Sequence, residues 1–124
     1  MSLSAIYIAI GGAIGALFRG IICMLFDKYY SKKFPLAVFL INCLGCFLCG
    51  FFNECPKWKY LTNDFRDSIT TGFCGGFTTF STFSTQTLKL GLNDEYLIMA
   101  INWLANHIFG FLFCYAGQEL GSKV

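Results

Sequence analysis

One stretch of the chain alternates aromatic and hydroxyl side chains. Phenylalanine recurs at every third position as Phe77, Phe80 and Phe83, and hydroxyl residues surround them: Thr78, Thr79, Ser81, Thr82, Ser84, Thr85 and Thr87. Hydroxyl groups donate hydrogen bonds, and the edge of a phenyl ring is electropositive because of the ring quadrupole. A small anion stripped of its water would find compensating donors here. We therefore interpret the run as an anion path, the alternative being helix packing by Ser and Thr with lipid contact by Phe.

Further uncharged donors and one cation stand in other apolar stretches. Asn42 supplies an amide, and Asn102, Asn106 and His107 occur in the last apolar stretch. Arg19 is the only fixed charge deep in such a stretch. A charge of this kind usually faces a polar cavity or a partner, although a long side chain can also snorkel to a nearby helix end. In both cases the deep charge is positive, which favours an anion as the ion handled.

Two adjacent glycines, Gly75 and Gly76, stand directly before Phe77, the first of these phenylalanines. Adjacent glycines destabilise a helix and permit unusual backbone angles, so we expect the helix to be broken near this pair. A break at mid-membrane frees backbone carbonyl groups, which is tolerated only where they are buried in protein or line a cavity. Freed carbonyls can hold a monovalent cation. The sequence thus predicts a helix break whose carbonyl groups can hold a cation, next to a path for an anion.

The composition indicates a membrane protein. Of 124 residues, 56% are hydrophobic and only 13% are charged, whereas about a quarter of the residues of a soluble domain are charged. Nine basic and seven acidic side chains are too few to cover the surface of a small globule. A net charge of +2 is too small for a nucleic-acid-binding surface. The composition therefore disfavours a soluble globule, a disordered chain and a nucleic-acid binder, and leaves one membrane domain, residues 1–124.

Charge-free runs define the membrane spans. Each run is long enough to cross about 30 Å of hydrocarbon as a helix of about 20 residues. We expect four transmembrane helices joined by short loops, at roughly 3–26, 34–53, 67–89 and 96–119. The first run lacks a basic start, and Arg19 stands where a signal peptide would be cleaved, so we expect this run to be retained as a helix. No loop is large enough for a soluble catalytic domain.

Positive charges outside the spans are balanced between the two sides of the membrane. One side would carry Lys57, Lys59, Arg66 and Lys123, and the other Lys28, Lys32, Lys33 and Lys89. Because Lys and Arg usually orient a membrane protein, four against four gives no preferred direction. Two interpretations stay open: another feature sets the orientation, or the chain inserts both ways and opposed copies form an antiparallel two-fold dimer.

The segment Gly75-Gly-Phe-Thr-Thr-Phe-Ser-Thr-Phe-Ser84 resembles the signature of the CrcB/Fluc fluoride channels. The other spans agree with it through Gly11-Gly12, Gly15, Arg19, Asn42-x-x-Gly45 and Gly110. The resemblance covers essentially the whole chain. It implies an all-α, multi-pass protein of the cell membrane that passively exports fluoride. It also implies an antiparallel dual-topology dimer, with two pores along the interface, formed with a second copy or a close paralogue.

Roles for individual residues follow from the resemblance. Phe80 and Phe83 would turn their ring edges toward fluoride, and Asn42 would be an amide donor in the pore. The backbone carbonyls of Gly75 and Thr78 from both subunits would hold a structural sodium ion, Na⁺. Hydroxyl side chains would add to the pore lining, namely Thr79, Ser81 and Thr82.

The chain departs from the family pattern in two places. Gln86 stands where many relatives carry an acidic residue, so a role for that carboxylate is absent here. Phe111 stands where relatives often have a small hydroxyl residue, and Tyr115 follows one turn later. The part of the pore contributed by the fourth helix therefore stays open.

Other functions are compatible with parts of the sequence. Cys43, Cys46 and Cys49 have the spacing of a metal-ligand run, but the same spacing places small apolar side chains on one face of a helix. A small dual-topology exporter of cationic drugs would need a carboxylate embedded in the membrane, but all seven acidic residues lie outside the spans or at their ends, with Glu119 the nearest. A structural subunit of a membrane complex fits the composition but gives the hydroxyl–phenylalanine run no purpose. No nucleophile–base pair points to an enzyme.

Overall fold

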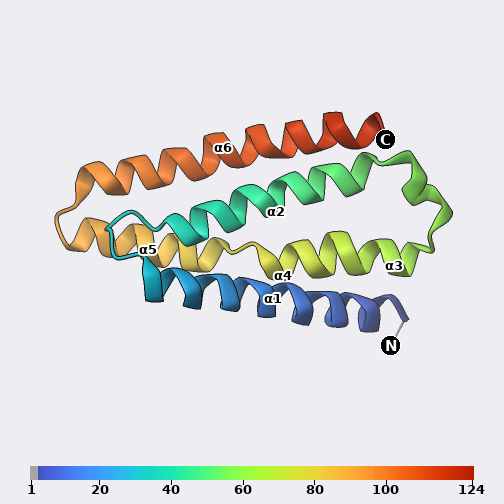
Figure 1. The fold of residues 1–124 in the computed structure, drawn as a ribbon, viewed down its shortest axis with the longest axis horizontal. Coiled ribbons are helices and arrows are strands. Elements are labelled where there is room, and N and C mark those ends of the chain that lie inside the picture. The colour runs from blue at the N-terminus through green and yellow to red at the C-terminus, as the bar shows by residue number, and fades with distance from the viewer. Residues whose placement is uncertain (1–2) are drawn as a thin grey trace.

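Residues 3–124 are described by a computed structural model, in which four membrane-length segments run antiparallel to their neighbours in the chain (Figure 1). The first is helix α1 (Leu3–Tyr29), and the second is α2 (Leu36–Glu54). A 3-10 turn, η1 (Pro56–Tyr60), leads to the third segment, and α6 (Tyr96–Ser122) is the fourth. The third segment consists of four pieces: α3 (Asn63–Asp67), the π-helical η2 (Ser68–Cys74), α4 (Gly75–Phe77) and α5 (Phe80–Leu92).

Three of the four segments, α1, α2 and α6, are long and apolar enough to cross a membrane as single helices. The 27 residues of α1 extend about 40 Å at about 1.5 Å per residue, which exceeds a hydrocarbon core of about 30 Å. The third segment runs alongside them but is divided in its middle. The prediction of an all-α, multi-pass membrane protein with four helical segments is confirmed. The boundaries differ by a few residues: α1 ends at Tyr29 rather than 26, α2 begins at Leu36 rather than 34 with Pro35 as its N-cap residue, and α6 ends at Ser122 rather than 119.

Glycines bring α1 and the third segment into backbone contact. A Cβ atom on Gly15 would lie 2.2 Å from the carbonyl oxygen of Phe73, and one on Gly76 would lie 2.4 Å from that of Gly12. No real side chain tolerates such distances, so only glycine permits the two backbones to approach this closely. The G-x-x-x-G spacings in these two segments are therefore packing motifs, as membrane helices commonly use them.

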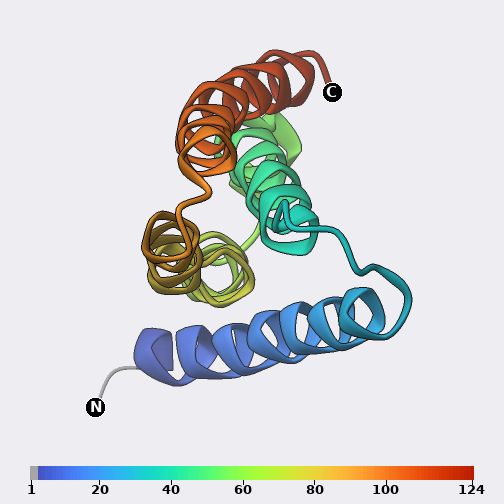
Figure 2. The ribbon, with the colours of Figure 1, turned by 90° about the vertical axis from the view of Figure 1, so that its left-hand side faces the viewer.

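A second glycine contact joins α2 to α6. A Cβ atom on Gly117 would lie 2.1 Å from the carbonyl oxygen of Phe47, and one on Gly121 would lie 2.3 Å from that of Phe51. These two helices form the most extensive contact of the bundle. Viewed end-on, α1 and α6 lie on opposite sides of the bundle (Figure 2). The third segment is thus held between α1 on one side and the α2–α6 pair on the other.

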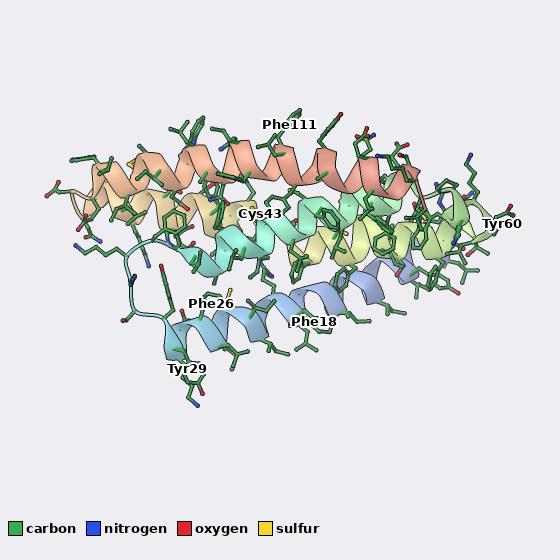
Figure 3. The ribbon with its side chains drawn as sticks, turned by 45° about the horizontal axis from the view of Figure 1, so that its top comes forward. Phe18, Phe26, Tyr29, Cys43, Tyr60 and Phe111 are labelled. Carbon is green, nitrogen blue, oxygen red and sulfur yellow. The ribbon has the colours of Figure 1, made fainter. Side chains whose placement is uncertain are left out.

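Large apolar side chains cover the outside of the bundle. Phe111 of α6 projects away from it (Figure 3) and is 74% exposed, and Phe18 of α1 is 51% exposed although its ring meets that of Phe73 edge-on. Only a few apolar side chains are fully enclosed, among them Val38 and Ile41 of α2. A soluble monomer rarely exposes continuous apolar surface of this kind, whereas lipid chains cover it without cost. The exterior therefore agrees with a membrane location.

The third segment is broken, but the break lies after the glycine pair rather than at it. Gly75 keeps helical angles, with φ −64° and ψ −40°, and Gly76 lies within α4. The helix stops at Thr78, with ψ 158°, and Thr79 is fully extended, with φ −146° and ψ 121°. Gly76 is needed for its close approach to α1 and not for special backbone angles. The predicted break is confirmed, and its location is corrected to Thr78–Thr79.

Candidate ion-binding groove

A groove lies beside the break and collects residues from three parts of the chain. Its volume is about 260 Å³, and it receives side chains from α2, from the break with the first turn of α5, and from the middle of α6. The lining residues are Asn42, Cys46, Thr78, Thr79, Phe80, Phe83, Asn106 and His107. No charged side chain lines it. An ion in this groove would meet amides, hydroxyls, ring edges and backbone groups and no Lys, Arg, Asp or Glu side chain.

Asn42 holds the extended backbone of the break. Its Oδ1 atom accepts the N–H of Thr79 at 2.9 Å, and its Nδ2 atom donates to the carbonyl of the same residue at 3.2 Å. The side-chain hydroxyl of Thr79 caps α5 by accepting the N–H of Thr82 at 3.2 Å. These bonds replace those that a continuous helix would make, which is required of broken backbone at membrane depth. Asn42 therefore positions the break as well as lining the groove.

A chain of amides continues from Asn42 into α6. Nδ2 of Asn42 also donates to Oδ1 of Asn106 at 3.1 Å, and Nδ2 of Asn106 donates to Oδ1 of Asn102 at 3.0 Å. Asn102, only 1% exposed, donates from Nδ2 to Oγ1 of Thr87 on α5 at 2.9 Å. The Thr87 hydroxyl in turn donates to the carbonyl of Phe83 at 2.7 Å. The network thus ties the break to the middle of α5 through two other helices.

The two phenylalanines of the first turn of α5 occupy different positions in the groove. Their ring centroids are 5.9 Å apart at an interplanar angle of 52°. Phe83 is buried at 4% exposure, whereas Phe80 is 75% exposed. The ring of Phe83 also meets that of His107 edge-on at 5.7 Å. Phe83 therefore forms the wall of the groove, and Phe80 stands at its open side.

One of the two ring nitrogens of His107 contacts the backbone. Its Nδ1 atom lies 2.7 Å from the carbonyl oxygen of Trp103, and its ring stacks on the Trp103 ring at 4.2 Å. A carbonyl oxygen only accepts, so Nδ1 must carry the hydrogen. In the neutral ring Nε2 is then an acceptor. His107 and the asparagines of α6 were noticed in the sequence as donors but not assigned to a site, and the i, i+4 spacing of Asn102 and Asn106 on an apolar helix was the available signal.

The predicted hydroxyl residues do not all reach the groove. Thr79 lines it, with its hydroxyl used for capping α5. Ser81 is exposed and Thr82 is half-buried, and neither lines the groove. Ser81 contributes its backbone carbonyl to the hydroxyl of Thr85. Of the predicted pore residues, Asn42, Thr79, Phe80 and Phe83 are brought together, while Ser81 and Thr82 lie to the side.

The break frees the two carbonyl groups predicted to hold a cation. In a continuous helix the N–H of Thr79 would donate to the carbonyl of Gly75, but here it donates to Asn42. The Thr78 carbonyl would receive the N–H of Thr82, which donates instead to the Thr79 hydroxyl. Thr78 is itself anchored, because its N–H and its hydroxyl both donate to the carbonyl of Cys74. Uncharged carbonyl oxygens of this kind suit a monovalent cation.

Other candidate groups lie outside the groove. Arg19 is half-buried in α1 and makes no ion pair with any residue of the described part. Gln86 lines a separate cavity of about 270 Å³ at the end of α5, together with Lys32, Lys33 and Lys89. Its Oε1 atom is buried and has no hydrogen-bond partner within residues 3–124. Asp27 also lines this cavity, and Lys33 forms an ion pair with Glu95, so the positive charge at this end of α5 comes chiefly from Lys32 and Lys89.

The cysteine run of α2 does not form a metal site in the described part of the chain. Within residues 3–124, no three His, Cys, Asp or Glu side chains are arranged to hold a metal ion. All seven cysteines are free thiols. Cys46 faces the groove, and its sulfur lies 3.6 Å from the position that a Cβ atom on Gly110 would take. The spacing thus reflects a packed helix face, as its alternative interpretation predicted.

Comparison with known proteins places this architecture in a family. Residues 6–118 match the family model of the CrcB-like protein, Camphor Resistance (CrcB). A fluoride-specific ion channel FluC from Dehalococcoides mccartyi is 39% identical over 119 residues, covering 93% of this chain and 89% of that protein. A protein of the same name from Shewanella oneidensis is 35% identical, covering 91% of both chains. The fluoride-specific ion channel FluC 2 of Staphylococcus saprophyticus is 33% identical, covering 96% and 97%. The chain therefore belongs to the CrcB-like family.

Proposed function

We propose that this protein is a fluoride-selective ion channel that passively exports fluoride and so lowers its concentration inside the cell. Relatives that align over nearly the whole chain are named fluoride-specific ion channels. The observation that carries the proposal is the groove, in which a broken backbone brings Asn42, Thr79, Phe80 and Phe83 together without any charged group. The function is therefore conduction and not catalysis.

The chemistry of the groove matches the cost of moving fluoride. Fluoride is small and strongly hydrated, so it leaves water only where several donors replace its hydration shell. The ring edges of Phe80 and Phe83 offer positive electrostatic potential without a fixed charge. A fixed positive charge would bind the anion too tightly for release, whereas several moderate sites permit passage. Larger halides lose their water more easily but are excluded by width, so selectivity combines donor density with size.

A second subunit would complete the pore. Phe80 is 75% exposed, and the groove is open on the side where this ring stands. We propose that a second copy, or a close paralogue, packs against this face in the opposite orientation. The even distribution of Lys and Arg between the two ends of the bundle supports insertion in both directions. An antiparallel pair would then present two equivalent grooves along its interface, with lipid around the outside.

Sodium is the proposed structural cofactor of that pair. The carbonyl groups of Gly75 and Thr78 have lost their helical donors at the break, which leaves two oxygens per subunit for a cation at the two-fold axis. Bound there, Na⁺ would join the two broken segments electrostatically. If Na⁺ binds there, the dimer should be more stable to dilution and to heating in Na⁺ than in N-methylglucamine. Radioactive sodium should also bind to the protein saturably.

Efflux from liposomes tests the proposed function. Vesicles that contain only this protein are loaded with potassium fluoride or potassium chloride, and release is followed with ion-selective electrodes after addition of valinomycin. The proposal predicts rapid fluoride release and chloride release no faster than from protein-free vesicles. Release of both ions at similar rates, or of neither, would contradict it. Selective fluoride release from these vesicles would also show that one chain suffices without a paralogue.

A further inference from the structure

One histidine stands in the groove, and it is the only histidine of the chain. His107 lies in the middle of α6 and lines the groove together with Phe83 and Asn106. The residue is exposed, so an ion in the groove can reach the outer nitrogen of its ring, Nε2. Imidazole is the side chain that ordinarily changes charge between about pH 5 and 8. His107 can therefore add a charge to a groove that otherwise has none.

The ring of His107 is held in one orientation. Its Nδ1 atom donates to the carbonyl oxygen of Trp103 at 2.7 Å, and its ring stacks on the ring of Trp103 at 4.2 Å. It also meets the ring of Phe83 edge-on at 5.7 Å. These contacts engage Nδ1 and the ring itself, which leaves Nε2 for the groove.

The two protonation states of His107 present opposite groups to an anion. In the neutral ring Nε2 carries a lone pair, which repels an anion. In the charged ring Nε2 carries a hydrogen and can donate a charge-assisted hydrogen bond. The contact of Nδ1 with the Trp103 carbonyl is the same in both states, and an indole face favours a cation stacked on it. Protonation thus changes the group offered to the ion without requiring a rearrangement of α6.

No other charged group faces His107 in the described part of the chain. The helices packed most closely against α6 are α2 and α5, which bring Asn42, Cys46, Phe80 and Phe83 to the groove. The thiol of Cys46 is the only other titratable group in the lining, and thiols ordinarily titrate above about pH 8. The charged residues of the three helices lie near the helix ends, namely Glu54, Lys89 and Glu119. A proton on His107 would therefore find no carboxylate partner there, and its charge would act on an ion in the groove.

We propose that His107 is a proton-dependent anion site, at which the protonated Nε2 atom donates a hydrogen bond to fluoride. The neutral ring lets fluoride pass, and the charged ring holds it. Acid should therefore lower the fluoride concentration at which conduction is half-saturated. It should also lower the maximal rate, because an ion leaves a deeper site more slowly. The inference rests on the proposed function and adds to it that protons regulate conduction.

Fluoride currents across planar bilayers at about pH 5 and about pH 8 test the proposal, since imidazole titrates between these limits. Currents are measured because hydrogen fluoride, which forms in acid and crosses lipid unaided, is neutral and carries none. The full-length protein is studied over a range of fluoride concentrations, which separates the half-saturating concentration from the maximal current. In wild type the half-saturating concentration should be about tenfold lower in acid, because a hydrogen bond from a charged donor contributes about that factor. The maximal current should fall as well.

His107→Gln and His107→Asn remove the titratable group. Both amides are uncharged at either pH, so the half-saturating concentration should be the same at both, whatever the size of the current. His107→Asn can still donate to the Trp103 carbonyl, which keeps the proposal testable if His107→Gln disturbs α6. Glu119→Gln is the matched control, because it removes a titratable group of the same helix that does not line the groove. It should keep the wild-type difference between the two pH values.

The outcomes separate this inference from the proposed function. Equal half-saturating concentrations at the two pH values in wild type would overturn the inference, and so would a maximal current that does not fall in acid. A pH difference retained by both His107 variants would also overturn it. In each of these cases the fluoride channel itself would stand. Lack of fluoride-selective current from wild type at both pH values would contradict the proposed function, and the inference with it.

Discussion

Asn42 holds the peptide groups on both sides of Thr79, accepting its N–H at 2.9 Å and donating to its carbonyl at 3.2 Å. One side chain on α2 thereby satisfies the extended residue at the break of the third segment. The same arrangement places the rings of Phe80 and Phe83, which follow directly, against the groove. The break is a consequence of this side-chain contact as much as of the local sequence.

Substitution of Asn42 should damage both stability and conduction. Asn42→Ala removes the two hydrogen bonds to Thr79 and the one to Asn106, so we expect the free energy of unfolding to fall by about 1–3 kcal/mol. Fluoride efflux should fall with it, because the backbone of Thr79 is released. Thermal melts in detergent and efflux from liposomes measure the two effects. Leu40→Ala, on the outward face of the same helix, is the control, and equal efflux from both variants would contradict the assigned role.

The contact between Thr87 and Asn102 should be energetically coupled. Thr87→Val keeps the shape of the side chain but leaves a buried amide hydrogen of Asn102 without its acceptor, at a cost of about 1–3 kcal/mol. A double-mutant cycle with Asn102→Leu should give a coupling energy of about 0.5–3 kcal/mol. Thr85→Val, at an exposed position of the same helix, should have little effect. A coupling energy near zero would show that the amide network does not act as a unit.

Gly76 should tolerate no side chain. Gly76→Ala would place a methyl group 2.4 Å from the carbonyl oxygen of Gly12, and overpacking of this kind costs about 1–3 kcal/mol. Gly20→Ala meets no atom within 4 Å and removes the helix penalty of glycine, so it should be neutral or slightly stabilising. Melting temperatures of the two variants check this contrast. Equal stability would mean that α1 and α4 are not held in backbone contact.

The lysine-lined cavity beside Gln86 should act as an electrostatic funnel. Lys89→Gln removes a positive charge from its lining, so fluoride efflux should slow by a few-fold at low ionic strength. The effect should shrink at high ionic strength, because salt screens the attraction between exposed charges. Lys57→Gln, outside the cavity, is the comparison variant. A loss of efflux that is independent of salt would argue against steering.

Much of the fold could be predicted from the distribution of charges. Runs without charge are a direct consequence of the membrane interior, so four helical segments and their approximate limits followed from them. The glycines of α1, of the third segment and of α6 that make the close contacts occur in pairs four residues apart, a spacing typical of packed membrane helices. The position of the break could not be predicted this way, because Gly75 and Gly76 suggested special backbone angles, whereas Gly75 keeps ordinary helical angles and Gly76 is used for its close approach to α1.

The residues of the groove were predicted only in part. Phe80, Phe83 and Asn42 could be recognised because their residue types and spacing are distinctive in apolar sequence. Asn102 and Asn106 were harder to assign, since their role depends on how α6 packs against α2 and α5.

Fluoride efflux through Phe80→Ile tests the central claim most directly. Phe80 is 75% exposed, so its replacement costs the subunit little packing energy, whereas the ring edge at the open side of the groove is lost. We expect efflux to fall about tenfold or more, the change produced by raising a barrier about 1.4 kcal/mol, while the protein keeps its wild-type assembly state. Phe18→Ile, which changes a half-exposed ring of α1 that does not line the groove, should conduct as wild type does. Wild-type efflux from Phe80→Ile would contradict the account of the groove as the fluoride path.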